Sequence, residues 1–245
     1  MARARAFGDA AALYERGRPP YPPAALDWLL PRTARRVLDL GAGTGKLTRQ
    51  LVARGLDVVA VEPLDGMRAE LTRVLPGTRV LAGSAEQIPL DHGSADAVLF
   101  AQAWHWVNPA RAVPEVARVL SPGGTLGLVW NDWDKHVGWV AELGRIIGET
   151  RDQDSEPQDN TSDHPRVGAP FSPLERHDVP WIHHLGVAEL LDMVASRSDV
   201  ILLPPDERQT LLDRVRLLAE TDPALAGRPE ISLAYVTHCW RCYRP

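Results

Sequence analysis

Short apolar runs alternate with amphipathic stretches along the first half of the chain. The runs predict strands, and the stretches between them, with apolar residues three or four positions apart, predict helices. The predicted strands cover residues 36–40, 57–62, 78–82, 95–101 and 125–130, and the predicted helices cover 46–54, the segment through Met67 and Leu71, and 109–120. Strands that are apolar on both faces and separated by helices indicate a parallel sheet covered by helices. Ligands of such sheets bind at the carboxyl edge of the strands.

The second half of the chain has a different pattern. The Ser-Pro-Gly-Gly run at 121–124 predicts a turn, and the polar stretch 151–168 predicts a weakly structured loop. Further predicted helices cover 137–150, 187–193 and 205–219, and predicted strands cover 174–184 and 231–243. Two strands that close the chain after a helical insertion favour one domain over two.

The composition is that of an ordinary soluble globular protein, with 44% hydrophobic and 24% charged residues among 245. A formal net charge of −5 argues against non-specific binding of nucleic acid, which needs concentrated lysine and arginine. No apolar run is long enough to span a bilayer, and residues 1–8 lack the apolar core of a secretion signal. We therefore expect a cytoplasmic protein without a membrane or nucleic-acid partner.

A glycine-rich run, G-x-G-x-G at residues 41–45, follows the first predicted strand and the acidic Asp39. Glycines at a strand-to-helix crossing let the backbone approach a ligand closely. A P-loop is excluded because Leu40 and Leu47 stand where its first glycine and its Ser or Thr belong. A dinucleotide fingerprint lacks its third glycine, because position 46 is Lys.

This run resembles the nucleotide-binding motif of the class I methyltransferases that use S-adenosylmethionine. Three more family marks follow in order: Glu62 at the end of the second predicted strand, residues 83–86 after the third, and residues 121–124 before the fifth. The resemblance covers residues 35–131. It implies an α/β, Rossmann-like fold with a seven-stranded, mostly parallel sheet, an antiparallel last strand and helices on both faces. It also implies S-adenosylmethionine as cofactor, S-adenosylhomocysteine as product and no metal.

The family resemblance also implies which residues bind the cofactor. Glu62 would accept hydrogen bonds from the ribose hydroxyls, a geometry that suits a carboxylate. Met67 would pack on the adenine, and Ala85 and Glu86 would meet the adenine edge; the alternatives are a core methionine and solvated carboxylates. The predicted set at the strand ends is Gly41, Ala42, Gly43, Glu62, Pro63, Met67, Ser84, Ala85, Glu86 and Gln102.

The N-terminal segment carries a Tyr-x-x-x-Arg-Pro-x-Tyr-Pro pattern from Tyr14 to Pro22. It resembles the lid of the branch that includes enzymes like trans-aconitate methyltransferase. The resemblance implies that Tyr14, Arg18 and Tyr21 close over the cofactor, with Arg18 suited to a carboxylate. The alternative is a proline-rich linker.

Aromatic residues gather at the predicted active-site edge. Trp104, His105 and Trp106 follow the fourth predicted strand. Trp130 lies at the end of the fifth, and Trp133 lies after it. Indole rings suit an apolar or aromatic acceptor and can face a sulfonium cation. We expect these five residues to bind substrate, although at least one tryptophan should fill the core. Because histidine titrates near neutral pH, His105 is the candidate catalytic or orienting group; the alternative is a structural histidine.

Two further clusters lie in the C-terminal part. Trp181, His183 and His184 could contribute to an acceptor pocket. Cys239 and Cys242 form one C-x-x-C pair, which supplies two of the four ligands of a zinc site. On a strand, side chains three positions apart point to opposite faces, so we interpret both cysteines as unpaired and structural.

These features predict a methyltransferase acting on a small-molecule acceptor through oxygen, nitrogen or carbon, for example a carboxylate or natural product of secondary metabolism. The alternatives are methylation of a peptide terminus and a non-catalytic module that binds S-adenosylmethionine. We expect one domain over 1–245: an N-terminal lid and first helix (1–34), a cofactor-binding core (35–131) and a C-terminal half with an acceptor-side helical insertion (132–245).

Overall fold

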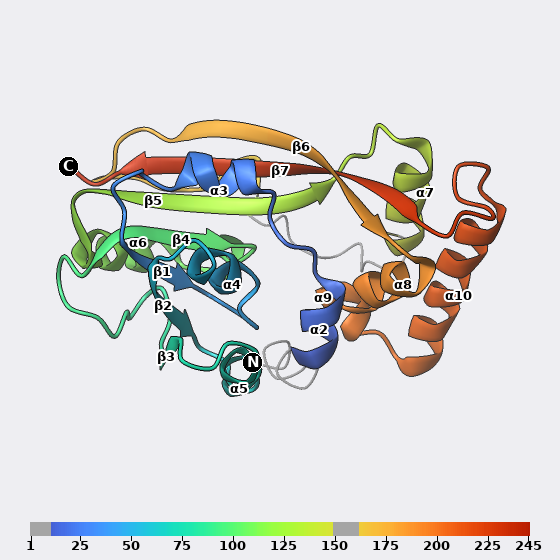
Figure 1. The fold of residues 1–245 in the computed structure, drawn as a ribbon, viewed down its shortest axis with the longest axis horizontal. Helices are drawn as coiled ribbons and strands as arrows, with labels where there is room; N and C mark the ends of the chain where they lie inside the picture. Colours follow the sequence, from blue (N-terminus) through green and yellow to red (C-terminus); the bar gives the residue numbers. More distant parts are fainter. Residues whose placement is uncertain (1–10, 149–161) are drawn as a thin grey trace. The chain divides into compact units, whose positions relative to one another are not determined.

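The computed structural model describes residues 11–148 and 162–245 (Figure 1). These residues fall into two compact units. Unit 1 comprises Met1–Pro19, Asp132–Pro157 and Pro180–Val236, and unit 2 comprises Pro20–Asn131, Gln158–Val179 and Thr237–Pro245, apart from the residues outside the described ranges. Each unit is described by itself below, and the single domain expected from the sequence stays a prediction.

Within the described residues, seven strands form one sheet in the order β3-β2-β1-β4-β5-β7-β6. Their bounds are β1 Arg36–Leu40, β2 Asp57–Glu62, β3 Arg79–Ala82, β4 Ala95–Ala101, β5 Leu120–Trp133, β6 Glu175–Leu185 and β7 Ile231–Tyr243. The pairs β3-β2, β2-β1, β1-β4 and β4-β5 are parallel, whereas the β7 arrow runs against those of β5 and β6 (Figure 1). The predicted fold class, with its antiparallel last strand, is confirmed.

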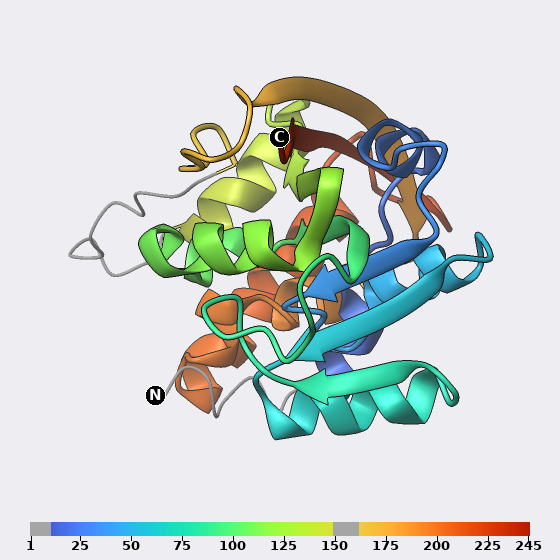
Figure 2. The ribbon, with the colours of Figure 1, turned by 90° about the vertical axis from the view of Figure 1, so that its left-hand side faces the viewer.

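Unit 2 contains the parallel strands and the helices that cover them. These helices are α3 Pro23–Leu29, α4 Lys46–Val52, α5 Asp65–Val74, the short 3₁₀ helix η1 Trp104–Trp106 and α6 Pro109–Val119. Helix α6 lies on one side of the strands, and α3 and α4 lie on the other (Figure 2).

The strand sequences explain this two-sided cover. Along β4, Val98 and Phe100 pack in the same cluster as α6, whereas Ala97 and Leu99 pack with α3 and α4. Successive side chains of a strand point to opposite faces, so a run that is apolar at every position is buried on both. The predicted bounds of β1, β2 and β4 agree with the structure for this reason.

The segment 121–124 differs from its prediction. It belongs to β5 instead of forming a separate turn, and the β4–β5 register shifts between Ala95 and Ala97. Gly123 has a positive φ of 73°, and its N–H donates to the carbonyl of Arg244 at 3.0 Å. The glycines therefore make an irregularity within a continuous strand, and the pairing with the chain end keeps it extended.

Unit 1 contains α2 Ala11–Gly17, α7 Gly138–Gly148, α8 Val187–Ala195, α9 Ser198–Ile201 and α10 Pro205–Thr221. Its core joins apolar residues of α7, α8 and α10 with Leu233 and Tyr235 of β7. The sequence predicted α7, α8 and α10, but not the short α9. Of the predicted loop 151–168, residues 151–161 lie outside the described residues, and 162–168 contain neither helix nor strand.

Both cysteines are free and fully buried on β7. Cys239 packs with the α3–α4 side of the sheet and Cys242 with the α6 side, which confirms that they point to opposite faces. Burial raises the pKa of each thiol to about 12. No helix in the described ranges is long and apolar enough to cross a membrane.

The buried thiols give a first prediction. In native protein at pH 8, neither cysteine should react with a thiol reagent on the time scale of minutes, because the thiolate is the reactive form and both sulfurs are covered. Both should react at once in denaturing urea. Spectroscopic titration of free thiols checks this, and rapid native labelling would contradict the packing of β7.

Candidate cofactor and acceptor site

The glycine loop lies between β1 and α4 in unit 2. Gly41, Gly43 and Gly45 have φ values of 68°, 56° and 91°, in the left-handed region that glycine tolerates best. A Cβ placed on Gly41 would lie 2.7 Å from the Cβ of Ala103. The glycine loop therefore lies directly against the segment that follows β4, which contains His105.

Glu62, the last residue of β2, holds this loop in place. Its Oε2 accepts from the Gly43 N–H and its Oε1 from the Leu64 N–H, both at 2.9 Å. The side chain is buried, and that burial raises the pKa of its carboxyl, although the two backbone N–H groups and Arg68 oppose the rise. A carboxylate has about four acceptor positions, so Glu62 retains capacity for a ligand diol.

Asp39 lies in the middle of β1 and is fully buried. Its Oδ2 accepts from the Thr48 hydroxyl of α4 at 2.6 Å, whereas Oδ1 has no hydrogen-bond partner among the described residues. Burial, and to a smaller extent the nearby charge of Glu62, raises the pKa of Asp39 to about 7. The sequence showed an acid in an otherwise apolar strand, and this was the signal for a second buried carboxyl next to the glycine loop.

Gln102 has a strained backbone directly after β4. Its φ of 55° lies in the left-handed region, which is uncommon for a residue other than glycine. Its N–H donates to the Val129 carbonyl at 2.9 Å, and its side-chain amide donates to the Asn131 carbonyl at 3.0 Å. Strain of this kind is common at functional sites, and here bonds to the end of β5 maintain it.

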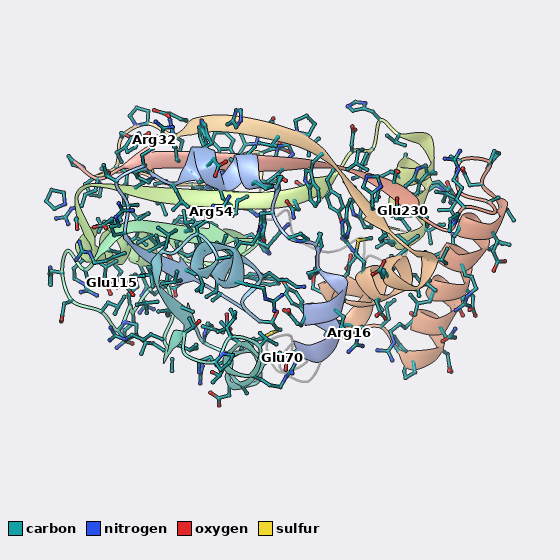
Figure 3. All side chains as sticks on the ribbon, viewed as in Figure 1. Arg16, Arg32, Arg54, Glu70, Glu115 and Glu230 are labelled. Atoms are coloured by element: carbon teal, nitrogen blue, oxygen red, sulfur yellow. The ribbon has the colours of Figure 1, made fainter. Side chains whose placement is uncertain are left out.

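The segment after β3 is fixed by acidic side chains. Ser84 and Gln87 form an isolated bridge, and Ala85 between them is buried. Glu86 accepts from the Asn108 N–H at 2.9 Å, so one of its oxygens has a structural partner at the start of α6. Glu115 of α6, labelled in Figure 3, accepts from the Ile88 N–H at 3.0 Å. The roles of Ser84, Ala85 and Glu86 at the adenine stay predictions.

The other predicted cofactor residues of unit 2 lie around the same loop. Ala42 is buried next to Gly41, and Pro63 lies exposed between β2 and α5. Met67 is buried on α5. Tyr21 is buried, and the Gln50 side chain of α4 both accepts from its N–H and donates to its carbonyl, at 2.9 and 2.7 Å. The roles of these residues at the cofactor stay predictions.

The three tryptophans of unit 2 near the strand ends have different environments. Trp104 is fully buried in the core and meets Phe100 edge-on, with ring centroids 4.8 Å apart. We correct its expected role: a fully buried indole fills the core and presents no surface to an acceptor. Trp130 is also mostly buried, whereas Trp106 is 52% exposed.

His105 is half-buried between two of these rings. Its Nδ1 accepts a long hydrogen bond, 3.4 Å, from Nε1 of Trp130, and its ring lies 4.9 Å from that of Trp106. Because Nδ1 accepts, a neutral His105 carries its proton on Nε2. The geometry thus favours a hydrogen-bond donor at Nε2 over a proton acceptor.

The remaining predicted residues belong to unit 1. The Arg18 guanidinium lies 5.0 Å from the centre of the Tyr14 ring. Trp133 donates from Nε1 to the Tyr235 hydroxyl at 2.9 Å. Trp181 stacks on Tyr235 and lies 5.8 Å from His183. Tyr14 thus pairs with Arg18, while Trp133 and Trp181 contact Tyr235. The lid role expected for Tyr14 and Arg18 stays a prediction.

Comparison with known proteins agrees with this geometry. Residues 38–128 match the model of a methyltransferase domain. The chain is 58% identical to an uncharacterized methyltransferase of Mycobacterium tuberculosis over 235 residues, 96% of this chain and 94% of that protein. It is 34% identical to an uncharacterized methyltransferase-like protein of Schizosaccharomyces pombe, over 95% and 93% of the two chains. The chain is a class I S-adenosylmethionine-dependent methyltransferase.

A solved structure gives the same fold. It is assigned as a type II methyltransferase of Anaeromyxobacter dehalogenans and superposes with a TM-score of 0.65 at 23% identity. The superposition covers 93% of this chain and 97% of the other.

The residues present fit the cofactor of the methyltransferase. Gly41 and Gly43 hold the left-handed backbone that the motif requires. Glu62 has acceptor capacity for the ribose hydroxyls, and the unpartnered Oδ1 of Asp39 suits an ammonium group or a water bound to it. Among the described residues, no group of three or more His, Cys, Asp or Glu is placed to hold a metal ion.

The Glu62 contacts predict the effect of its removal. Glu62→Ala should weaken binding of S-adenosylhomocysteine by roughly 10- to 100-fold, because it removes charge-assisted acceptors worth about 1.5–3 kcal/mol. Isothermal titration calorimetry measures this. Asp57→Ala, at the exposed start of the same strand, is the matched control and should bind normally. Equal affinity of both variants would remove Glu62 from the site.

The raised pKa of Asp39 predicts a pH-dependent stability. Below about pH 4 the Asp39 carboxyl is protonated in both the folded and the unfolded chain, so it does not change the stability of the fold. As the pH rises toward about 7, ionisation in the unfolded chain lowers the stability of the fold, and this loss reaches its maximum above about pH 7. Asp39→Asn should therefore raise the unfolding free energy of the cofactor-free protein at pH 8, by about 4 kcal/mol at most, and progressively less toward pH 4.

Urea denaturation at pH 5, 6, 7 and 8 tests this. Asp57→Asn serves as the control because Asp57 is exposed on the neighbouring strand. A gain for Asp39→Asn that does not grow with pH would show that ionisation of Asp39 does not destabilise the fold.

Proposed function

We propose that this methyltransferase methylates a small-molecule acceptor. The observation that carries the proposal is the close approach of Ala103 to Gly41, which brings His105, Trp106 and the glycine loop together at one edge of unit 2. An exposed indole beside an imidazole suits the flat apolar part and the polar atom of a small acceptor. Methylation of a peptide terminus is the second candidate, because a peptide carboxylate is also a small acid.

The chemistry that the cofactor supplies when bound is a methyl group on a sulfonium: a bond forms between the methyl carbon and the acceptor atom, and the carbon–sulfur bond breaks with its electron pair left on sulfur. The protein's residues therefore need to hold the acceptor in line and exclude water. Neither task needs a covalent step on a side chain.

His105 has an orienting role in this proposal. With Nδ1 bonded to Trp130, its Nε2–H can donate to an oxygen or nitrogen of the acceptor and fix the direction of a lone pair. A carboxylate acceptor needs no base, whereas the proton of a hydroxyl or amine acceptor leaves to solvent as the bond to methyl forms. Trp130 is then a positioning residue for His105.

Two substitutions of His105 separate an orienting donor from a base. His105→Gln keeps an N–H donor and should retain most of the turnover, whereas His105→Ala should lose roughly 10-fold or more, since one hydrogen bond to the acceptor is lost. Transfer of methyl to a panel of small acids, phenols and amines, followed by mass spectrometry, measures this. The exposed His92→Gln is the control.

The two roles give different results. A general base would make both His105 variants equally poor, with losses of 10²–10⁴-fold. Affinity for S-adenosylhomocysteine should be unchanged in both, which separates an effect on the acceptor from a loss of fold. Absence of methylated product from every small acceptor, together with methylation of a peptide carboxylate, would overturn the proposal in favour of the second candidate.

A further inference from the structure

Unit 1 holds two arginines, Arg18 and Arg197, near the buried phenol of Tyr235. Helix α2 lies beside α8 in unit 1 (Figure 1). A Cβ on Gly17 would lie 2.5 Å from the Asp192 carbonyl oxygen and 2.7 Å from Ser196 Oγ, so glycine is required for this approach. The approach lets Arg18 donate from Nη2 to the Ser196 carbonyl at 3.3 Å, directly beside Arg197.

Arg18 lacks a carboxylate partner among the described residues. Its Nε is buried and has no hydrogen-bond partner there, and its Nη2 bond to Ser196 is long. The planar guanidinium lies over the Tyr14 ring, which leaves its edge for a ligand. A buried donor without an acceptor is unfavourable, so an anion that accepts from it would bind favourably.

Arg197 is only weakly paired. Its contacts with Asp199 are 3.3 and 3.4 Å, longer than the 2.7–2.9 Å of a strong charge-assisted pair. Its guanidinium lies 5.0 Å from the centre of the Trp133 ring. Both Arg18 and Arg197 are close enough to Tyr235 to lower the pKa of its phenol, although burial raises that pKa to about 12 and Asp132 adds to the rise.

Aromatic rings surround this pair of cations. Tyr235 accepts from Trp133 Nε1 and donates to Met193 Sδ at 3.1 Å. Trp181 stacks on Tyr235 with centroids 5.1 Å apart, and His183 meets both rings. Trp133 and Trp181 are half-buried and so present ring surface beside the arginines.

We propose that Arg18, Arg197, Tyr235, Trp133 and Trp181 form a site for an aromatic carboxylic acid, with the carboxylate on the two guanidiniums and the ring against the indoles. Two planar cations match the two oxygens of a carboxylate, and indoles match a flat apolar body better than a flexible chain. A free aromatic acid is the source of the carboxylate that we propose. The methionyl end of the cofactor is the other source of a carboxylate, and the test separates the two.

The protein of residues 1–245 is titrated with 2-naphthoate by calorimetry, in the presence of saturating S-adenosylhomocysteine. The uncharged analogue 2-naphthalenemethanol is the ligand control. Naphthoate should bind at least 10-fold more tightly than the alcohol. Arg18→Met and Arg197→Met should each weaken the binding of naphthoate at least 10-fold, and Arg18→Lys should weaken it less. Arg216→Met on exposed α10 is the matched control and should bind as the wild type does.

The same variants are titrated with S-adenosylhomocysteine alone. Unchanged affinity for S-adenosylhomocysteine supports an acid site. If the variants lose affinity for S-adenosylhomocysteine but keep their affinity for naphthoate, the arginines belong to the cofactor site and the inference is overturned. Equal binding of naphthoate and the alcohol also overturns it. Circular dichroism of each variant shows whether it is folded. If Arg18→Met does not fold, Arg18→Lys still allows the test.

Methyl transfer assays then separate this inference from the proposed function. Arginine-dependent binding of naphthoate without methylation of any small acceptor would contradict the proposed function and leave the acid site standing. Methylation of aromatic acids at a rate independent of Arg18 and Arg197 would support the proposed function and refute the acid site.

Discussion

The carboxylate of Glu62 is the interaction on which the cofactor edge of unit 2 depends. It bonds the Gly43 N–H of the loop after β1 and the Leu64 N–H before α5, so two strand-to-helix connections share one acceptor. With the loop held there, Gly41 can contact Ala103, so the segment that contains His105 lies next to the loop. Glycine is required at position 41 for two independent reasons, its positive φ and the nearness of the Ala103 Cβ.

Two buried carboxyls next to this loop lower the stability of the fold. Asp39 and Glu62 lie on adjacent parallel strands, and burial raises the pKa of both. An apolar residue at position 39 would suit the surrounding strand better, since Leu38 and Leu40 are fully buried in the core. Polar groups without full compensation are typical of a site built for a ligand, which completes their hydrogen bonds on binding.

The sequence predicted the parallel core well because its signal is local. Strands β1, β2 and β4 are mostly apolar, β1 is followed by Gly41, and β2 ends at Glu62. The details that the sequence missed depend on partners far along the chain. The continuity of β5 through 121–124 depends on Arg244, and the structural bond of Glu86 depends on Asn108. Likewise, no local pattern reveals that Trp130 bonds His105 or that Gln50 holds Tyr21.

The tryptophans of the chain have different environments. Eight are present, with three phenylalanines. In the structure they differ in the partner of the indole N–H and in what lies on the ring face. Trp240 donates from Nε1 to the Ser162 carbonyl, the Arg241 guanidinium lies over the Trp28 ring, and Trp104 fills the core. Indoles replace phenylalanine where a ring must also donate a hydrogen bond or face a cation. Trp106 keeps half of its surface exposed beside His105, and a ligand bound at this edge would cover that apolar surface.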